Sequence, residues 1–125
     1  MREDLHAASR SLGLAQRLVL RAHLRRVEPL VGPSETVQLV APGWWRGHRS
    51  AVVVTTSRLL LVRRANRPGS LGHAAFDVRS IAQLSVHASP PEGARFRFGV
   101  GLDLVEFSVT RNAAEVERAL QASRG

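Results

Sequence analysis

The sequence predicts an α+β, mainly β protein in which a seven-stranded antiparallel sheet bends into a barrel and a C-terminal helix closes its open end. Residues 35–109 hold seven short apolar segments with turn-forming residues between them. A helical apolar period follows the last segment, and another precedes the first. The length of 125 residues and the hydrophobic content of 44% suit one domain that can bury a core.

Residues 4–27 have the period of an amphipathic helix. Leu5, Leu12 and Val19 recur every seventh residue, and arginines lie largely to one side of them. Gly13 weakens the helix by about 1 kcal/mol. This helix can pack on its own domain, pair with a second copy of the chain or lie on a membrane surface. If it exposes its three heptad residues, we expect a homodimer.

The apolar period changes to two at the start of the first strand, residues 35–43. Residues 44–49 then predict a loop. Residues 51–55 and 59–63 predict a hairpin of two central strands, because both segments are rich in β-branched residues and leucine.

Four more strands are predicted at residues 73–78, 81–87, 95–100 and 104–109. In the third of these, Phe96 and Phe98 face the core, and Arg95 and Arg97 face outward. Glu106 lies opposite Arg97 in the last hairpin, and we expect a surface ion pair worth at most about 1 kcal/mol.

The closing helix begins at Asn112, which has Glu115 three residues later in the manner of a capping box. Val116, Ala119 and Leu120 form its apolar stripe. A groove beside this helix, near Val116 and Leu120, is a candidate site for a partner peptide.

Seven short strands and a closing helix resemble the pleckstrin-homology superfold, specifically the bacterial PH-like domains of the YokE type and their GRAM relatives. The resemblance rests on residues 51–62, where an apolar strand, the motif Thr55-Thr56-Ser57-Arg58-Leu59 and a second apolar strand follow one another. Residues 76–86 and the helix from Asn112 also match the family pattern. The resemblance implies a PH-like domain over residues 33–125, preceded by a helical extension over residues 1–32. Such folds serve lipid binding, peptide binding and scaffolding.

Arg58 of this motif is expected to have a structural role. It can donate hydrogen bonds to backbone carbonyls or pair with Asp77.

The chain carries a net charge of +8, and its 18 basic residues are all arginine. Six of them lie within residues 36–76, which hold no Asp or Glu. A positive face attracts phosphates, an anionic membrane or an acidic partner.

The sequence contains no recognisable catalytic motif. The chain has no cysteine, which excludes disulfides and a thiol nucleophile. The five histidines lack metal-ligand spacing, and no pair of carboxylates stands in a recognisable context. We therefore expect no enzyme activity, no metal and no cofactor.

The candidate residues for binding a lipid or a partner are Trp44, Trp45, Arg46, His48, Arg49, Arg63, Arg64 and Arg67. The adjacent tryptophans point to opposite sides, so at least one is expected to be partly exposed as an anchor. In eukaryotic PH domains this region binds inositol headgroups through a basic-x-Arg pattern. His48-Arg49 departs from that pattern, which favours a nonspecific anionic surface over headgroup recognition. Arg63 and Arg64 face opposite sides of a strand and do not form one site by themselves.

The sequence favours a noncatalytic adaptor module that binds a protein partner, in the cytoplasm and at the inner membrane surface. No apolar run approaches the length of a membrane span, and the N-terminus lacks the apolar block of a signal peptide. One alternative is peripheral binding of anionic lipid as the primary role. Nucleic-acid binding is the other, and it would need Phe96 or Phe98 to face water.

Overall fold

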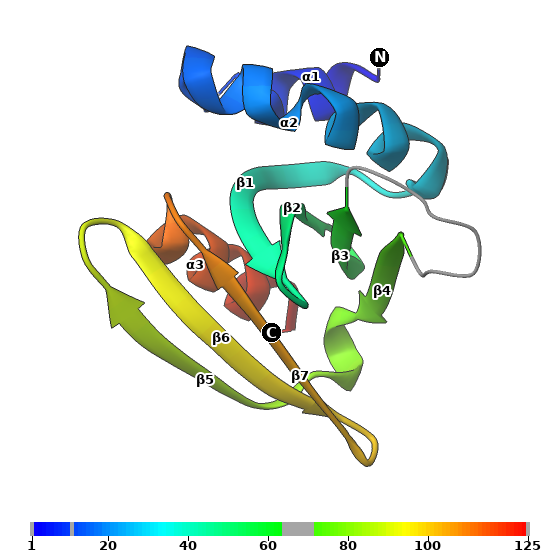
Figure 1. Cartoon of the computed structure of the whole chain (residues 1–125). Coiled ribbons are helices and arrows are strands. Elements are labelled where there is room, and N and C mark those ends of the chain that lie inside the picture. Colours follow the sequence, from blue (N-terminus) through cyan, green and yellow to red (C-terminus); the bar gives the residue numbers. More distant parts are fainter. Residues whose placement is uncertain (1, 11, 64–71, 125) are drawn as a thin grey trace.

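The computed structural model describes residues 2–10, 12–63 and 72–124, with the side chains of all but residues 14, 15, 18, 19 and 124. Its elements are α1 (Glu3–Ser9), α2 (Leu14–Val27), η1 (Glu28–Leu30), β1 (Val37–Trp45), β2 (His48–Thr55), β3 (Arg58–Arg63), β4 (His73–Asp77), η2 (Val78–Ser80), β5 (Ala82–Ser89), β6 (Gly93–Val100), β7 (Asp103–Val109) and α3 (Ala113–Arg124) (Figure 1). Within the described residues, the strands form one antiparallel sheet in the order β4-β3-β2-β1-β7-β6-β5. The predicted fold class is confirmed.

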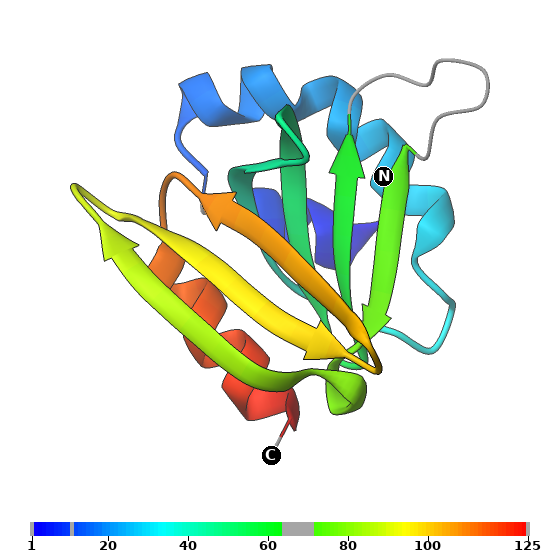
Figure 2. The same ribbon diagram turned by 60° about the horizontal axis from the view of Figure 1, so that its bottom comes forward.

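The sheet bends where β1 meets β7. These strands pair only at Gly43↔Val109 and Trp44↔Ser108. The halves β1–β4 and β5–β7 therefore splay apart from this corner, as Figure 2 shows. A Cβ on Gly43 would lie 2.1 Å from the carbonyl oxygen of Ser108, so the close approach of the two backbones requires glycine.

The main core lies between these two halves and α3. Its largest fully buried side chains are Phe96, Phe98, Leu59, Leu61 and Leu120. Phe96 stacks on Phe107 with ring centroids 4.9 Å apart. The closing helix is confirmed, but Val116 and Leu120 are fully buried in this core. These two side chains therefore are not accessible to a peptide in the predicted groove beside the helix.

The predicted single helix over residues 4–27 is two helices. Gly13 precedes α2 with an extended backbone (φ −63°, ψ 162°), which interrupts the helical path. Leu5 and Leu12 are buried, so neither is available for dimerisation. The side chain of Val19 is not among those described.

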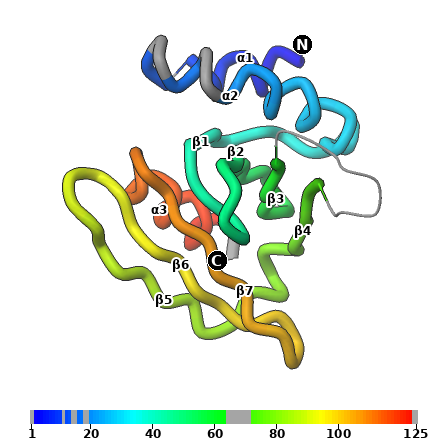
Figure 3. The backbone as a smooth tube through the Cα atoms, in the orientation of Figure 1, coloured from blue at the N-terminus to red at the C-terminus, as the bar shows by residue number. Residues whose placement is uncertain are grey.

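Helices α1 and α2 cover the outer face of the β1–β3 part of the sheet (Figures 1 and 3). One buried cluster contains Leu20, Leu24 and Val27 of α2 together with Val40, Ala51, Val53, Leu60 and Val62 of the strands. The main core covers the other face of the same strands. Both faces of the central hairpin are thus buried, which explains its continuous apolar runs.

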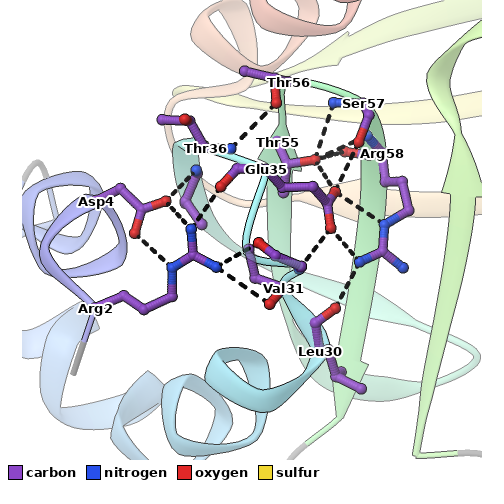
Figure 4. A network of polar contacts seen from close by, with 12 residues as sticks. Arg2, Asp4, Leu30, Val31, Glu35, Thr36, Thr55, Thr56, Ser57 and Arg58 are labelled. Atoms are coloured by element: carbon purple, nitrogen blue, oxygen red, sulfur yellow. Dashed lines mark hydrogen bonds and ion pairs between the residues drawn. The ribbon is translucent and has the colours of Figure 1, made fainter.

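A polar network ties the helices to this hairpin (Figure 4). Arg58 Nε donates a hydrogen bond to Glu35 Oε2 (3.0 Å), and Arg58 Nη2 donates to the carbonyl of Leu30 (2.6 Å). The expected bond to a carbonyl is confirmed. The alternative prediction of an ion pair with Asp77 is wrong, because Arg58 forms its ion pair with Glu35.

The Glu35 carboxylate accepts further hydrogen bonds from the hydroxyls of Thr55 (2.7 Å) and Ser57 (2.9 Å) and from the backbone N–H of Gly32 (2.8 Å). The hydrogen bonds from Arg58 are the main reason why the pKa of Glu35 lies far below its usual range, and they raise the pKa of Arg58. This carboxylate therefore stays ionised and joins the start of β1 to the β2–β3 turn.

A second carboxylate fastens α1 to β1. Asp4 Oδ2 accepts the backbone N–H of Val37 at 2.6 Å, and Asp4 Oδ1 accepts Arg2 Nε at 3.0 Å. The hydrogen bond from Val37 is the leading cause of the lowered pKa of Asp4. Arg2 in turn donates to the carbonyls of Gly32 and Glu35 at 2.8 and 2.6 Å.

The predicted loop over residues 44–49 is wrong. Strand β1 runs on through both tryptophans, and β2 already begins at His48. The turn consists of Arg46 and Gly47, whose φ angles of 52° and 75° are typical of a tight two-residue hairpin. Both tryptophans therefore belong to a regular strand.

Candidate functional site

The tryptophan pair splits between the two faces of β1. The side chain of Trp45 is 4% exposed and belongs to the main core, whereas that of Trp44 is 41% exposed. The prediction that the pair points to opposite sides is confirmed. Trp44 is thus the partly exposed member of the pair.

Each indole has an arginine against its face. The Arg49 guanidinium carbon lies 5.1 Å from the centroid of the Trp44 ring, and that of Arg46 lies 5.1 Å from the Trp45 ring. Such cation–π contacts are worth about 0.5–1 kcal/mol at exposed sites. Arg49 is the register partner of Trp44 on β2, so strand pairing itself brings this cation to the indole.

Strand pairing extends this contact into a row across the sheet. Trp44 lies opposite Arg49 on β2 and, on its other side, opposite Ser108 on β7. Ser108 in turn lies opposite Arg95 on β6. Arg95 lies opposite His87 on β5. Directly opposed residues share one face of a sheet, which here faces away from the main core. We call Arg49, Trp44, Ser108, Arg95 and His87 the outer row. Figure 2 shows β7, β6 and β5 running side by side.

The acidic residue next to the outer row already has a partner. Arg97 and Glu106 lie opposite each other in the neighbouring row and form the predicted ion pair at 3.3 Å. Neither Arg49 nor Arg95 forms an ion pair with any described carboxylate. The outer row therefore carries two arginines that have no ion-pair partner within the part of the chain that the structure describes.

Two of the hollows beside these strands border candidate residues. A groove of about 640 Å³ is lined by His87, Arg95 and Ser108 of the outer row and by Pro91 and Thr110. A second cavity of about 720 Å³ lies between the β1–β2 and β6–β7 turns, and it is lined by Trp45, Arg46, Phe76, Leu104 and Glu106 among others. The first hollow belongs to the outer row, and the second opens beside the main core.

The other exposed large hydrophobic side chains among the described residues lie in the β6–β7 turn and at the start of β7. Leu102 of the turn is fully exposed, and Leu104 of β7 is 65% exposed. Leu104 lines the second cavity together with Arg46 and Gly47 of the β1–β2 turn. The β1–β2 turn and the start of β7 therefore border the same cavity.

The structure brings only part of the predicted set together. Trp44 and Arg49 join on the outer face, while Trp45 and Arg46 border the second cavity. His48 is exposed at the start of β2. Arg63 lies opposite the buried Ser50. Because Ser50 directly follows Arg49 in β2, Arg63 is on the other face of the sheet from Arg49. Arg64 and Arg67 lie outside the described residues.

Sequence reasoning missed Arg95, Ser108 and His87 as neighbours of Trp44. The outward direction of Arg95 is readable from its alternation with Phe96. The pairing of β1 with β7 has no local signal, because it joins residues far apart in the chain.

Nucleic-acid binding by base stacking on β6 is excluded. Phe96 and Phe98 are buried, whereas stacking on bases requires exposed rings. The alternation of these residues with arginine reflects one face in the core and one in water.

The described residues contain neither a metal-binding cluster nor a helix suited to span a membrane. No group of three His, Asp or Glu side chains there stands close enough to hold a metal ion. None of the described helices combines the length and apolarity that crossing a bilayer demands.

Comparison with known proteins supports the fold alone. The sequence matches no protein-family model and no curated protein. The structure is similar to a pleckstrin homology domain from Shewanella amazonensis SB2B (TM-score 0.53, 12% identity), with 80% of this chain and 93% of that chain covered. It is also similar to a DUF1696 family protein with a pleckstrin-homology domain from Shewanella loihica PV-4 (TM-score 0.55, 14% identity), covering 85% and 93%.

A third similar structure contains the linker and DH/PH domains of p115-RhoGEF. Its TM-score is 0.51 at 16% identity, and 98% of this chain and 40% of that chain are covered. All three structures contain a pleckstrin-homology domain. At such low sequence identities, the similarity shows the fold and gives no information on a ligand. The bent seven-stranded sheet with its C-terminal helix therefore has the fold of a pleckstrin-homology domain.

Proposed function

We propose that this protein is a noncatalytic binding and adaptor module that holds a partner protein on the outer row. The observation that carries the proposal is Trp44, which is 41% exposed on a regular strand with Arg49 against its ring. Tryptophan and arginine are the side chains most enriched among the residues that dominate protein–protein binding energy. PH-like folds commonly serve as binding modules, which agrees with this role by analogy.

The position of Trp44 favours a protein partner over a membrane. Its backbone pairs with β2 on one side and β7 on the other. Inserting its indole into a bilayer would require neighbouring strands to approach the headgroups together with it. A partner protein can instead cover the indole on the outer face of the sheet, where it can bury about 150–250 Å².

Replacing Trp44 with alanine is expected to abolish partner capture. The measurement is affinity capture from a lysate of the cells that make this protein, with bound proteins identified by mass spectrometry. The Leu102→Ala variant is the matched control, because it removes an exposed apolar side chain away from the outer row. Loss of a captured protein by at least tenfold in Trp44→Ala alone is the expected result. Equal capture by both variants and the unaltered chain would refute the proposal.

A second candidate function, contact with an anionic membrane, is favoured by the exposed leucines of the β6–β7 turn and the start of β7. Leu102 can insert into a bilayer while Arg46 contacts the headgroups. This alternative predicts sedimentation with phosphatidylserine-containing vesicles at physiological salt and its loss in the Leu102→Glu variant. The protein-partner proposal predicts that the unaltered chain stays in the supernatant.

A further inference from the structure

We propose that the outer row binds an extended acidic segment of the partner, which crosses the strands and places carboxylates on Arg49 and Arg95. This inference rests on the proposed function and names the chemistry of the segment that is recognised. It follows from the charge of the row, its spacing and the groove beside it.

The charge of the outer row selects an acidic ligand. Arg49 and Arg95 are exposed and have no carboxylate partner among the described residues. The nearby Glu106 is held by Arg97 at 3.3 Å, so it repels an incoming acid less than a free carboxylate would. Charged hydrogen bonds from arginine to a carboxylate are about twice as strong as neutral ones.

The spacing of the row defines the segment. Arg49 on β2 and Arg95 on β6 are separated by β1 and β7, which makes three strand spacings, or about 14 Å measured along the sheet and around its bend between β1 and β7. An extended chain advances about 3.3 Å per residue, so two acidic residues about four positions apart span this distance. Residues an even number apart share one side of an extended chain. The residue midway between them therefore also faces the row and meets Trp44, where an apolar side chain fits.

A hollow lies beside the row, on the side of the β5–β6 turn. The groove there is lined by His87, Arg95 and Ser108 of the row together with Pro91 and Thr110. It offers hydrogen-bonding side chains and an apolar wall to side chains of the segment that lie near the second carboxylate. A segment that crosses from β2 to β5 thus meets a cation, an indole and a second cation, with the groove alongside the last.

The test uses the full chain and a synthetic seven-residue peptide with blocked ends. The peptide has glutamate at its second and sixth positions, leucine at its fourth and alanine or proline elsewhere. Isothermal titration calorimetry at physiological salt measures its dissociation constant. Replacing both glutamates with glutamine, or making the two glutamates adjacent, is expected to weaken binding at least tenfold.

Variants of the protein locate the binding. Arg95→Ala and Trp44→Ala are each expected to weaken peptide binding at least tenfold. Arg79→Ala, which removes another exposed arginine away from the row, is expected to change it less than twofold. All three positions are surface side chains, and circular dichroism checks that each variant is folded.

Three outcomes would overturn the inference. These are equal binding of the glutamine peptide, equal loss in Arg79→Ala and Arg95→Ala, and binding of phosphatidylserine vesicles that the peptide does not displace. The proposed function survives if partner capture still depends on Trp44 while Arg95→Ala leaves it unchanged. It fails together with this inference if Trp44→Ala affects neither capture nor peptide binding.

Discussion

Replacing Leu20 with alanine is expected to lower the free energy of unfolding by about 3 kcal/mol, within the usual range of about 2–5 kcal/mol for a buried leucine. Leu20 is fully buried in the cluster between α2 and the outer face of the sheet. The loss combines the transfer free energy of the removed atoms with the cavity they leave. Domains have a total stability of only about 5–15 kcal/mol, so this one change removes a large share. Chemical denaturation followed by circular dichroism measures it.

The exposed Arg21 on the same helix supplies the control. Arg21→Ala is expected to change stability by less than about 0.5 kcal/mol. If Leu20→Ala were as mild as Arg21→Ala, then α2 would not cover the sheet in solution. Deleting residues 1–32 tests the same point more severely, because it uncovers apolar side chains on β1–β3. We expect that truncated chain to aggregate, which would show that the helical extension is required by the PH-like part.

Replacing Glu35 with glutamine is expected to cost about 3 kcal/mol, because it leaves the Arg58 guanidinium half-buried without its counter-charge. The carboxylate also accepts hydrogen bonds from Thr55, Ser57 and Gly32, and an amide cannot replace all of these. Glu92→Gln, at an exposed position, is the control and is expected to be neutral. A double-mutant cycle with Arg58→Gln should give a coupling energy of about 1–3 kcal/mol. A coupling energy near zero would contradict the ion pair.

The same carboxylate makes stability depend on pH. Because the pKa of Glu35 is lower in the folded chain than in the unfolded one, its contribution is present above the unfolded-state value of about 4.3. It is lost as the pH falls through the folded-state pKa. The lowered pKa of Asp4 acts in the same direction. Below about pH 5 the free energy of unfolding should therefore fall less steeply in Glu35→Gln than in the unaltered chain. Equal slopes would mean that Glu35 titrates normally in the fold.

The strands could be predicted from the sequence where their pattern is local. The central hairpin has two continuous apolar runs that suit no exposed element, and its bounds agree closely with β2 and β3. The β1–β2 turn was misplaced because Pro42 and Gly43 look like turn residues. In the structure, Gly43 instead serves the close approach to Ser108.

The local sequence pattern does not predict which residues distant in the chain become side-chain partners. The sequence offers backbone carbonyls or Asp77 as partners of Arg58, and Asp77 is indeed its register partner on β4. The guanidinium turns instead to Glu35, which precedes β1, and to the carbonyl of Leu30. In the same way the exposed tryptophan was predictable, whereas its neighbours on β6 and β7 depend on where the sheet bends. Charge and periodicity indicate that exposed tryptophan and arginine form the candidate site. The order of the strands in the sheet determines which of these residues lie next to one another.

The split of the two tryptophans has a spectroscopic consequence. The chain contains two tryptophans and no tyrosine, so its intrinsic fluorescence comes almost entirely from adjacent indoles in opposite surroundings. Trp45 emits from the apolar core, and Trp44 emits from the water-exposed outer row. A Trp44→Phe chain therefore reports the surroundings of the core indole, and a Trp45→Phe chain reports those of the outer-row indole. Neighbouring positions in one strand thus provide separate optical signals for the core and for the outer face of the sheet, without any attached dye.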